Sequence, residues 1–210
     1  MNETIVIVPG LYTPRFMMMP LARRFKQQGY NPIIVRHRYL MQTPEHNAQT
    51  LSVLIEQLGN SVVHLVGHSL GGLVILHLLN INRESPVKRV VLLGTPVHGS
   101  AIARKLYARS WARWLLGKST VNGLLRGTPT MQACTEIGVL YGTAKAGLAA
   151  MLFRFDGIGD GVVLADETRL DGAADRASIP HSHAIMLFSK VAADKTVQFI
   201  QTGQFLSDQR

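Results

Sequence analysis

The sequence contains very little cysteine and no long apolar run. Cys134 is the single cysteine among 210 residues, so an internal disulfide cannot form, which agrees with a reducing compartment. No apolar stretch approaches the roughly 20 residues that a membrane-spanning helix needs. The N-terminus passes from Met1 into the apolar run 5–8 without a basic segment or a cleavage site. We therefore expect a soluble, cytoplasmic protein.

Sequence patterns for metal and nucleotide binding are also missing. The chain has no H-E-x-x-H, no cysteine pair, no G-x-x-x-x-G-K-[ST], and no G-x-G-x-x-G in a strand-to-helix turn. It also lacks zinc-finger spacing, an RNA-binding aromatic motif and a helix-turn-helix signal. We expect no cofactor and no metal, and binding of nucleic acid would depend on charge alone.

Acidic residues are absent from two long stretches of this basic chain, whose formal net charge is +9. Residues 4–44 carry six arginines and lysines and no acid, and residues 100–130 do the same. The acids gather late, at Asp156, Asp160, Asp166, Glu167, Asp171 and Asp175. A solvated basic face is the ordinary interpretation, and attraction to an anionic membrane surface is the more specific one.

Short apolar, β-branched runs alternate with helical patterns along the chain. Strands are predicted at Thr4–Val8, Pro32–Val35, Val62–Val66, Arg89–Leu93, Ile137–Tyr141 and Ala177–Pro180. Helices are predicted at Pro20–Gln28, Pro44–Leu58 and Leu70–Asn80. This alternation predicts one α/β domain over residues 1–210, with a mostly parallel sheet of about six strands flanked by helices and little or no cap.

The segment Ser100–Gly127 is the least regular part of the pattern. Its apolar side chains, among them Trp111 and Trp114, interleave with arginines and lysines, as in an amphipathic basic helix or helix pair. One interpretation is a crossover helix packed on the sheet. The other is a flap beside the active site that also touches lipid, since tryptophan and arginine suit that boundary.

One serine stands in a glycine-rich turn. Gly67-His68-Ser69-Leu70-Gly71 is a G-x-S-x-G pattern that follows an apolar run and precedes a helical stretch. A tight strand-to-helix turn is sterically possible there only if the flanking positions lack side chains. The pattern predicts that the Ser69 hydroxyl is exposed at the positive end of the following helix, where it can act as a nucleophile.

A serine nucleophile needs a histidine base, and the base needs a carboxylate to orient it. In hydrolases with this turn the three follow in the order serine, acid, histidine. Of the eight histidines, only His181 and His183 lie beyond the acidic cluster. His183 is preferred because it sits in a loop between a short strand and the final helix, and His181 is the alternative.

Two Asp-Gly pairs in the stretch 156–163 supply the candidate acids, Asp156 and Asp160. Both could serve only as turn residues. Asp160 is preferred because Asp-Gly-Val-Val places a carboxylate in a loop that returns at once to apolar packing. The backbone N–H groups of Leu70 and Leu11 are the expected oxyanion donors, and Gly10 allows the sharp turn that aims the second.

With these residues the chain resembles the α/β-hydrolase superfamily and, within it, the small, cap-poor bacterial lipases and esterases. The resemblance implies that Ser69 is the nucleophile, Asp160 the acid after a late strand and His183 the base. The tail from Asp160-Gly-Val-Val through His183 to Val191 follows the pattern of minimal lipases. The first loop departs from it, because Pro9-Gly10 stands where such enzymes usually carry His-Gly.

Three functions are compatible with these observations. The first is a serine hydrolase of carboxylic esters, an esterase or lipase, that forms an acyl-enzyme on Ser69 and uses a small-molecule acyl ester as substrate. The second keeps the triad but transfers the acyl group to an alcohol or thiol. The third is a non-catalytic module that binds lipid or a partner through the basic segment. The intact order of serine, acid and histidine favours the first two.

Overall fold

The computed structural model describes residues 3–59, 61–82, 86–128, 135–146 and 156–206. Cys134 lies outside these ranges. Six strands form one sheet in the order β2-β1-β3-β4-β5-β6, and every pairing in it is parallel. The strands are β1 (Thr4–Val8), β2 (Asn31–Ile34), β3 (Val63–His68), β4 (Val87–Leu93), β5 (Glu136–Gly142) and β6 (Asp175–Ile179). The predicted fold class is confirmed.

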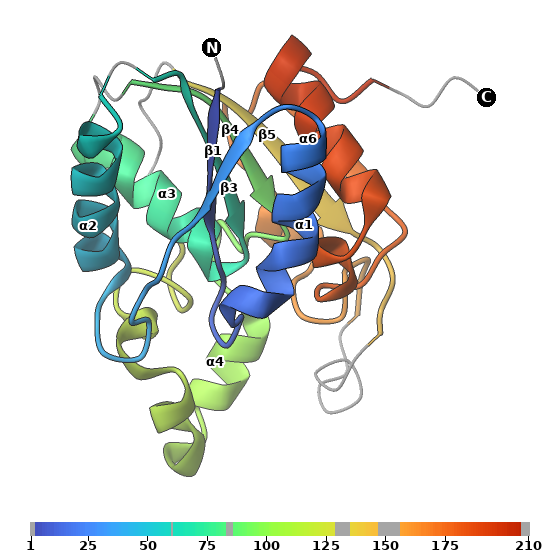
Figure 1. The fold of residues 1–210 in the computed structure, drawn as a ribbon. Coiled ribbons are helices and arrows are strands. Elements are labelled where there is room, and N and C mark those ends of the chain that lie inside the picture. Colours follow the sequence, from blue (N-terminus) through green and yellow to red (C-terminus); the bar gives the residue numbers. More distant parts are fainter. Residues whose placement is uncertain (1–2, 60, 83–85, 129–134, 147–155, 207–210) are drawn as a thin grey trace.

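Helices cover both faces of this sheet (Figure 1). Helices α2 (Pro44–Gln57) and α3 (Leu70–Ile81) pack on one face, and α1 (Arg15–Gln27) and α6 (Lys190–Thr202) pack on the other. Alternate residues of β1 serve the two layers, since Val6 and Val8 belong to the core beneath α2 and α3, whereas Ile5 and Ile7 belong to the core beneath α1 and α6. A parallel sheet buried on both faces explains why its strands read as continuous apolar runs.

Helix α1 begins five residues earlier than the sequence predicts. Pro20 was expected to open the helix, but it lies inside it, and the helix starts at Arg15 after Pro14. The buried side chains Met18, Leu21, Ala22 and Phe25 follow a helical spacing that already begins before Pro20. Packing of this apolar stripe on the sheet therefore outweighs the hydrogen bond that the proline cannot make.

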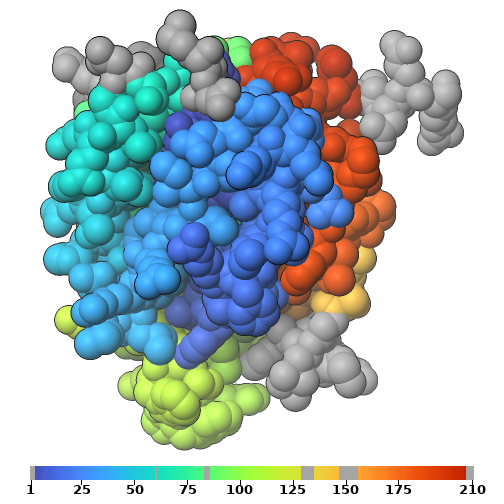
Figure 2. Space-filling view, viewed as in Figure 1, coloured from blue at the N-terminus to red at the C-terminus, as the bar shows by residue number. Residues whose placement is uncertain are grey.

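The segment Ser100–Gly127 does not form a crossover helix on the sheet. It contains the short helix α4 (Ala101–Tyr107) and two 3₁₀ turns, Ser110–Leu115 and Gly117–Thr120. It lies beyond the carboxyl ends of the strands and projects from the body of the molecule (Figures 1 and 2). We call residues 100–127 the excursion.

No helix within the described ranges combines the length and the apolar character that crossing a bilayer demands.

Candidate active site

Ser69 occupies a strained turn between β3 and α3. Its backbone has φ 53° and ψ −124°, a conformation that residues with a side chain rarely adopt. Its N–H donates to the carbonyl oxygen of Leu93 at 2.9 Å, which ties the turn to the neighbouring strand β4. Ser69 directly precedes α3, so its side chain lies at the positive end of that helix.

The glycines around Ser69 are required by close backbone approach. A Cβ on Gly67 would lie 2.6 Å from the Gly72 Cα, and a Cβ on Gly71 would collide with the carbonyl oxygen of Val8. Neither glycine has a positive φ, so the conformational strain falls on Ser69 itself. The predicted steric reason for the motif is therefore present in the structure, as contacts between α3, β3 and the end of β1.

Asp160 and His183 lie side by side, as the sequence order predicts. His183 Nδ1 is 2.7 Å from Asp160 Oδ2, and the His183 N–H donates to the Asp160 carbonyl oxygen at 2.9 Å. Asp160 is 1% exposed, and its Oδ1 accepts the N–H groups of Val162 and Val163 at 2.9 and 2.7 Å. These contacts fix the carboxylate and direct the Nδ1 proton of His183 toward it, which leaves Nε2 for other chemistry.

The alternative residues occupy other places. Asp156 is exposed and lines a separate small pocket with Arg176 and Tyr141. His181 is half-buried, and its carbonyl oxygen accepts the N–H of Ala144 at 3.3 Å. The structure thus pairs Asp160 with His183 and leaves both alternatives outside this pair.

Ser69 and His183 line one cavity of about 300 Å³. Its other walls are largely apolar and come from the first loop, the excursion and the loop of Asp160: Leu11, Ile102, Ala103, Leu106, Leu115, Leu116, Leu124 and Val163. No hydrogen bond joins the two side chains in the described part of the chain; in the absence of substrate, such contacts are commonly long. An apolar cavity with a hydroxyl and an imidazole in its wall can hold an acyl group beside both.

The two predicted oxyanion residues are placed at this cavity. Leu70 is the first residue of α3, so its N–H has no acceptor within the helix. Leu11 lines the cavity, and the loop that carries it touches the serine, because a Cβ on Gly10 would lie 2.9 Å from Ser69 Cβ. Both N–H groups therefore belong to backbone packed directly around Ser69.

Two tyrosines that the sequence analysis did not identify hold the first loop. Tyr39, which is buried, donates its hydroxyl to the carbonyl oxygen of Pro9. Burial raises the pKa of Tyr39 well above its usual value, so the hydroxyl keeps its proton. Tyr12 adopts a left-handed backbone conformation, with φ 56°, and donates its hydroxyl to the carbonyl oxygen of Leu115 in the excursion. The loop is thus fixed to the chain after β2 on one side and to the excursion on the other.

His68 contacts both the backbone and the ring of His183. His68 Nε2 lies 3.1 Å from the His183 carbonyl oxygen, and the centroids of the two rings are 4.5 Å apart. Burial, together with the neighbouring His183, lowers the pKa of His68 to about 3. The ring is therefore neutral at pH 7, and an Nε2–H can donate to this carbonyl. No local sequence pattern indicates this contact, so the sequence did not predict a role for His68.

Glu167 joins the loop of Asp160 to the excursion. Its side chain accepts the N–H of Leu164 at 2.9 Å and that of Ala101 at 2.5 Å, and Arg104 lies 3.4 Å away. Burial raises the pKa of Glu167, although the two N–H groups and Arg104 act in the opposite direction. This carboxyl group therefore positions the start of α4 relative to the loop that carries the candidate acid.

Across the described residues, no group of three or more histidine, cysteine, aspartate or glutamate side chains could hold a metal ion.

Comparisons with known proteins agree with this architecture. A family model described as alpha/beta hydrolase fold matches residues 16–132. The mature lipase BlEst2 of Bacillus licheniformis is 22% identical, with a TM-score of 0.75 over 95% of this chain and 91% of that chain. The metagenomic carboxyl esterase MGS0156 is 18% identical, with a TM-score of 0.67 over 88% and 65%, and the carboxylesterase CesB of Bacillus subtilis is 14% identical, with a TM-score of 0.59 over 96% and 84%. No curated protein matches in a sequence comparison.

Proposed function

Because the chain belongs to the alpha/beta hydrolase family, we propose that it is a serine hydrolase of carboxylic esters. The observation that supports this most strongly is one cavity whose wall contains both Ser69 and His183. Asp160 Oδ2 lies 2.7 Å from His183 Nδ1. The expected resemblance to lipases and esterases is confirmed at the level of family and fold.

The proposed reaction proceeds through an acyl-enzyme. His183 Nε2 takes the proton of the Ser69 hydroxyl, and Ser69 Oγ attacks the ester carbonyl carbon. The N–H groups of Leu11 and Leu70 stabilise the negative oxygen that forms. His183 returns the proton to the departing alcohol, and water then releases the acid by the same steps. Asp160 orients the imidazole and stabilises its charged form.

The size of the cavity indicates which acyl groups it accepts. Its volume of about 300 Å³ stands at the lower end of the usual range for ligand pockets. We therefore propose that acyl chains of short to medium length are preferred over long ones.

The test is hydrolysis of p-nitrophenyl esters from acetate to palmitate. Ser69→Ala and His183→Ala should each lower kcat more than about 10³-fold, and Asp160→Asn should lower it by a similar factor because the imidazole loses its orientation. Ser61→Ala, an exposed serine outside the cavity, and Asp156→Asn are matched controls. Full activity in a folded Ser69→Ala protein would refute the proposal.

An added acceptor distinguishes hydrolysis from acyl transfer. If an alcohol or thiol at low concentration captured most of the acyl group in place of water, a transferase would replace the hydrolase as the proposed function.

We also propose that the excursion contacts an anionic membrane surface. Trp111 and Trp114 are 66% and 71% exposed, and Tyr107 is 40% exposed. Arg113 and Lys118 are exposed nearby, and no acidic residue occurs within residues 100–130. Exposed tryptophans among basic side chains suit the interface of an anionic bilayer. We call Tyr107, Trp111, Trp114, Arg113 and Lys118 the aromatic tip.

A further inference from the structure

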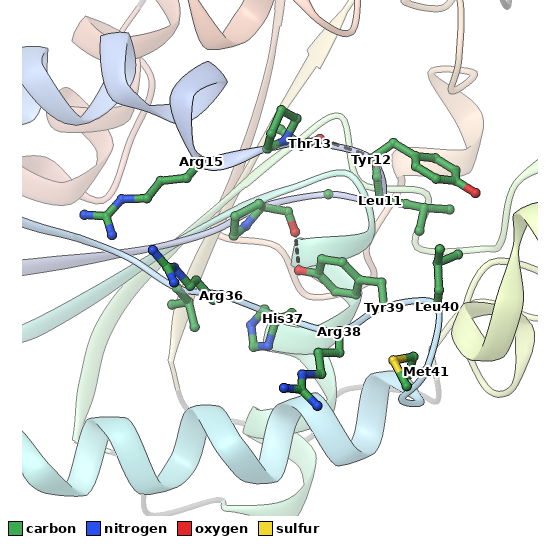
Figure 3. Close-up of a pocket in the computed structure, with 14 residues that line it drawn as sticks. Leu11, Tyr12, Thr13, Arg15, Arg36, His37, Arg38, Tyr39, Leu40 and Met41 are labelled. Atoms are coloured by element: carbon green, nitrogen blue, oxygen red, sulfur yellow. Dashed lines mark hydrogen bonds between the residues drawn. The ribbon is translucent and has the colours of Figure 1, made fainter.

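A second, larger cavity adjoins the first. It has a volume of about 870 Å³ and lies between residues 9–15 and residues 35–41 (Figure 3). Leu11, Tyr12 and Thr13 line both this cavity and the one that contains Ser69. The loop with the proposed oxyanion donor is thus the wall between the two cavities, and the proposed mechanism uses only one of them.

The two ends of this cavity differ in polarity. Leu11 and Leu40 lie toward the end that is nearer the excursion, whereas the side chains of Arg15 and Arg36 extend toward the opposite side (Figure 3). The chain at the apolar end is joined to the excursion, since the N–H of Lys118 donates to the Leu40 carbonyl oxygen at 3.1 Å. An occupant with an apolar part near Leu11 and an anionic part near the two arginines would match this gradient.

The arginines carry charge that this structure leaves unbalanced. Arg15, Arg36 and Arg38 line the cavity, are exposed, and form no ion pair with an acid in the described ranges. The described lining also contains no aspartate or glutamate. Arginine stays charged at every relevant pH, and its planar group donates paired hydrogen bonds to phosphate oxygens.

The backbone near Arg15 adds to this positive potential. Arg15 is the first residue of α1, whose first turn has no acidic residue and whose N-cap, Pro14, makes no side-chain hydrogen bond. The free N–H groups at the start of a helix carry partial positive charge. This contribution acts at the same end of the cavity as the arginine side chain.

His37 supplies polar ring atoms without charge. It lines the cavity, its ring nitrogens are buried, and its ring interacts with the side chain of Asn47 on α2. Burial lowers the pKa of His37 to about 4, so its ring is neutral at pH 7. The positive charge of the cavity therefore comes from the arginines and the helix.

We propose that this cavity, the Arg15–Arg36 pocket, binds a phosphate group on the alcohol half of the ester that Ser69 hydrolyses. The substrate class is then an acylated glycerol phosphate of the lysophospholipid type. The inference rests on the proposed function. The acyl group occupies the cavity of Ser69, the glycerol passes Leu11, and the phosphate meets Arg15 and Arg36. Hydrolysis breaks the acyl–oxygen bond, and glycerol phosphate leaves from this pocket.

Two esters that differ only in the phosphate test the inference. The ratio of kcat/KM for a 1-acylglycerol 3-phosphate to that for the matching 1-acylglycerol should be about tenfold or more in favour of the phosphate. The double variant Arg15→Gln/Arg36→Gln should bring this ratio close to one. Arg23→Gln, which removes one charge from an exposed position of α1 outside the pocket, should leave it within about twofold.

The outcomes separate the inference from the proposed function. Equal kcat/KM for the two esters, or a preference that Arg23→Gln removes as well, overturns the inference while hydrolysis itself stands. Absence of hydrolysis of any ester, p-nitrophenyl esters included, overturns the proposed function and the inference with it. Inorganic phosphate and glycerol 3-phosphate are added as competitors. If inorganic phosphate abolishes the preference at the concentration at which glycerol 3-phosphate does, the site binds free phosphate, and the assignment to a lipid headgroup is wrong.

Discussion

The hydroxyl of Tyr39 donates a hydrogen bond to the carbonyl oxygen of Pro9, thirty residues earlier in the chain. Pro9 precedes Gly10 and Leu11, so this bond holds the peptide that leads into the proposed oxyanion donor. Pro9 and Tyr39 line the larger cavity, and Leu11 lines both cavities. We therefore expect Tyr39 to position the first loop for the proposed chemistry at Ser69.

Tyr39→Phe should lower kcat for p-nitrophenyl esters about tenfold, with a smaller change in KM, because the Leu11 N–H stabilises the transition state more than the bound ester. The lost hydrogen bond to a buried carbonyl oxygen should also cost about 1–3 kcal/mol of stability. Tyr30→Phe, at a half-buried tyrosine that lines neither cavity, is the control. A reduced stability with unchanged kcat in Tyr39→Phe would show that the contact is structural only.

His68→Gln should change how stability depends on pH. The folded protein holds His68 neutral, with its pKa lowered from 6.5 to about 3. Between these values the unfolded chain binds a proton that the folded protein does not, so His68 makes the folded state less stable as the pH falls below 6.5. As the pH is lowered from 6.5 toward 3, the free energy of unfolding of the wild type should fall relative to that of the variant, by up to about 1.4 kcal/mol per pH unit.

Urea unfolding at pH 7, 6, 5 and 4 provides this comparison. If the difference in free energy of unfolding between the two proteins stays constant from pH 7 to pH 4, the assignment of a neutral, buried His68 is wrong.

Glu167→Gln should change the pH dependence in the opposite sense. Burial raises the pKa of Glu167 above 4.5, so the folded protein binds a proton that the unfolded chain has released. The wild type therefore loses stability relative to the variant as the pH rises from 4.5 through the raised pKa. Fluorescence of Trp111 and Trp114 follows unfolding next to α4, and a stability difference that does not vary with pH would contradict this prediction.

Replacing the tryptophans of the aromatic tip should weaken binding to anionic vesicles. Trp111→Ala/Trp114→Ala should weaken sedimentation with phosphatidylglycerol vesicles about tenfold or more, since two large apolar side chains no longer enter the interface. Ile81→Ala, at a residue 52% exposed near the end of α3, is the control. Equal binding by wild type and variant, or wild-type binding to neutral phosphatidylcholine that matches binding to phosphatidylglycerol, would remove the basis for this surface.

Much of the fold could be predicted from the sequence because buried parallel strands leave a direct signal. The run at Thr4–Val8 is apolar on both faces and becomes β1 with the predicted bounds. The edge strand β6 begins two residues before its prediction, since its Asp175 and Arg176 are polar. The predicted start of α1 at Pro20 was wrong. A proline is commonly found in the first turn of a helix, but here packing of the apolar stripe on the sheet extends the helix back to Arg15.

The candidate site was predictable only where chain order constrains it. Ser69, Asp160 and His183 each follow a strand of the same parallel sheet, so their order along the chain indicated which residues could meet. The contact of His68 with the backbone of His183 spans 115 residues, and that of Tyr39 with Pro9 spans 30. No sequence spacing encodes such contacts, because they arise only when the sheet is assembled.

The strand order has a consequence for the synthesis of the protein. Strand β1 lies between β2 and β3, and the candidate triad is collected from residues 69, 160 and 183. A ribosome-bound chain has made Ser69 and the first loop long before it makes His183, the proposed base. Strand β6 and the loop with His183 are made after β5, and β6 joins the edge formed by β5. If the proposed hydrolysis is the activity of this chain, it begins only once the strands that carry all three residues have joined the sheet, so the rate measures the fraction of chains that have folded this far.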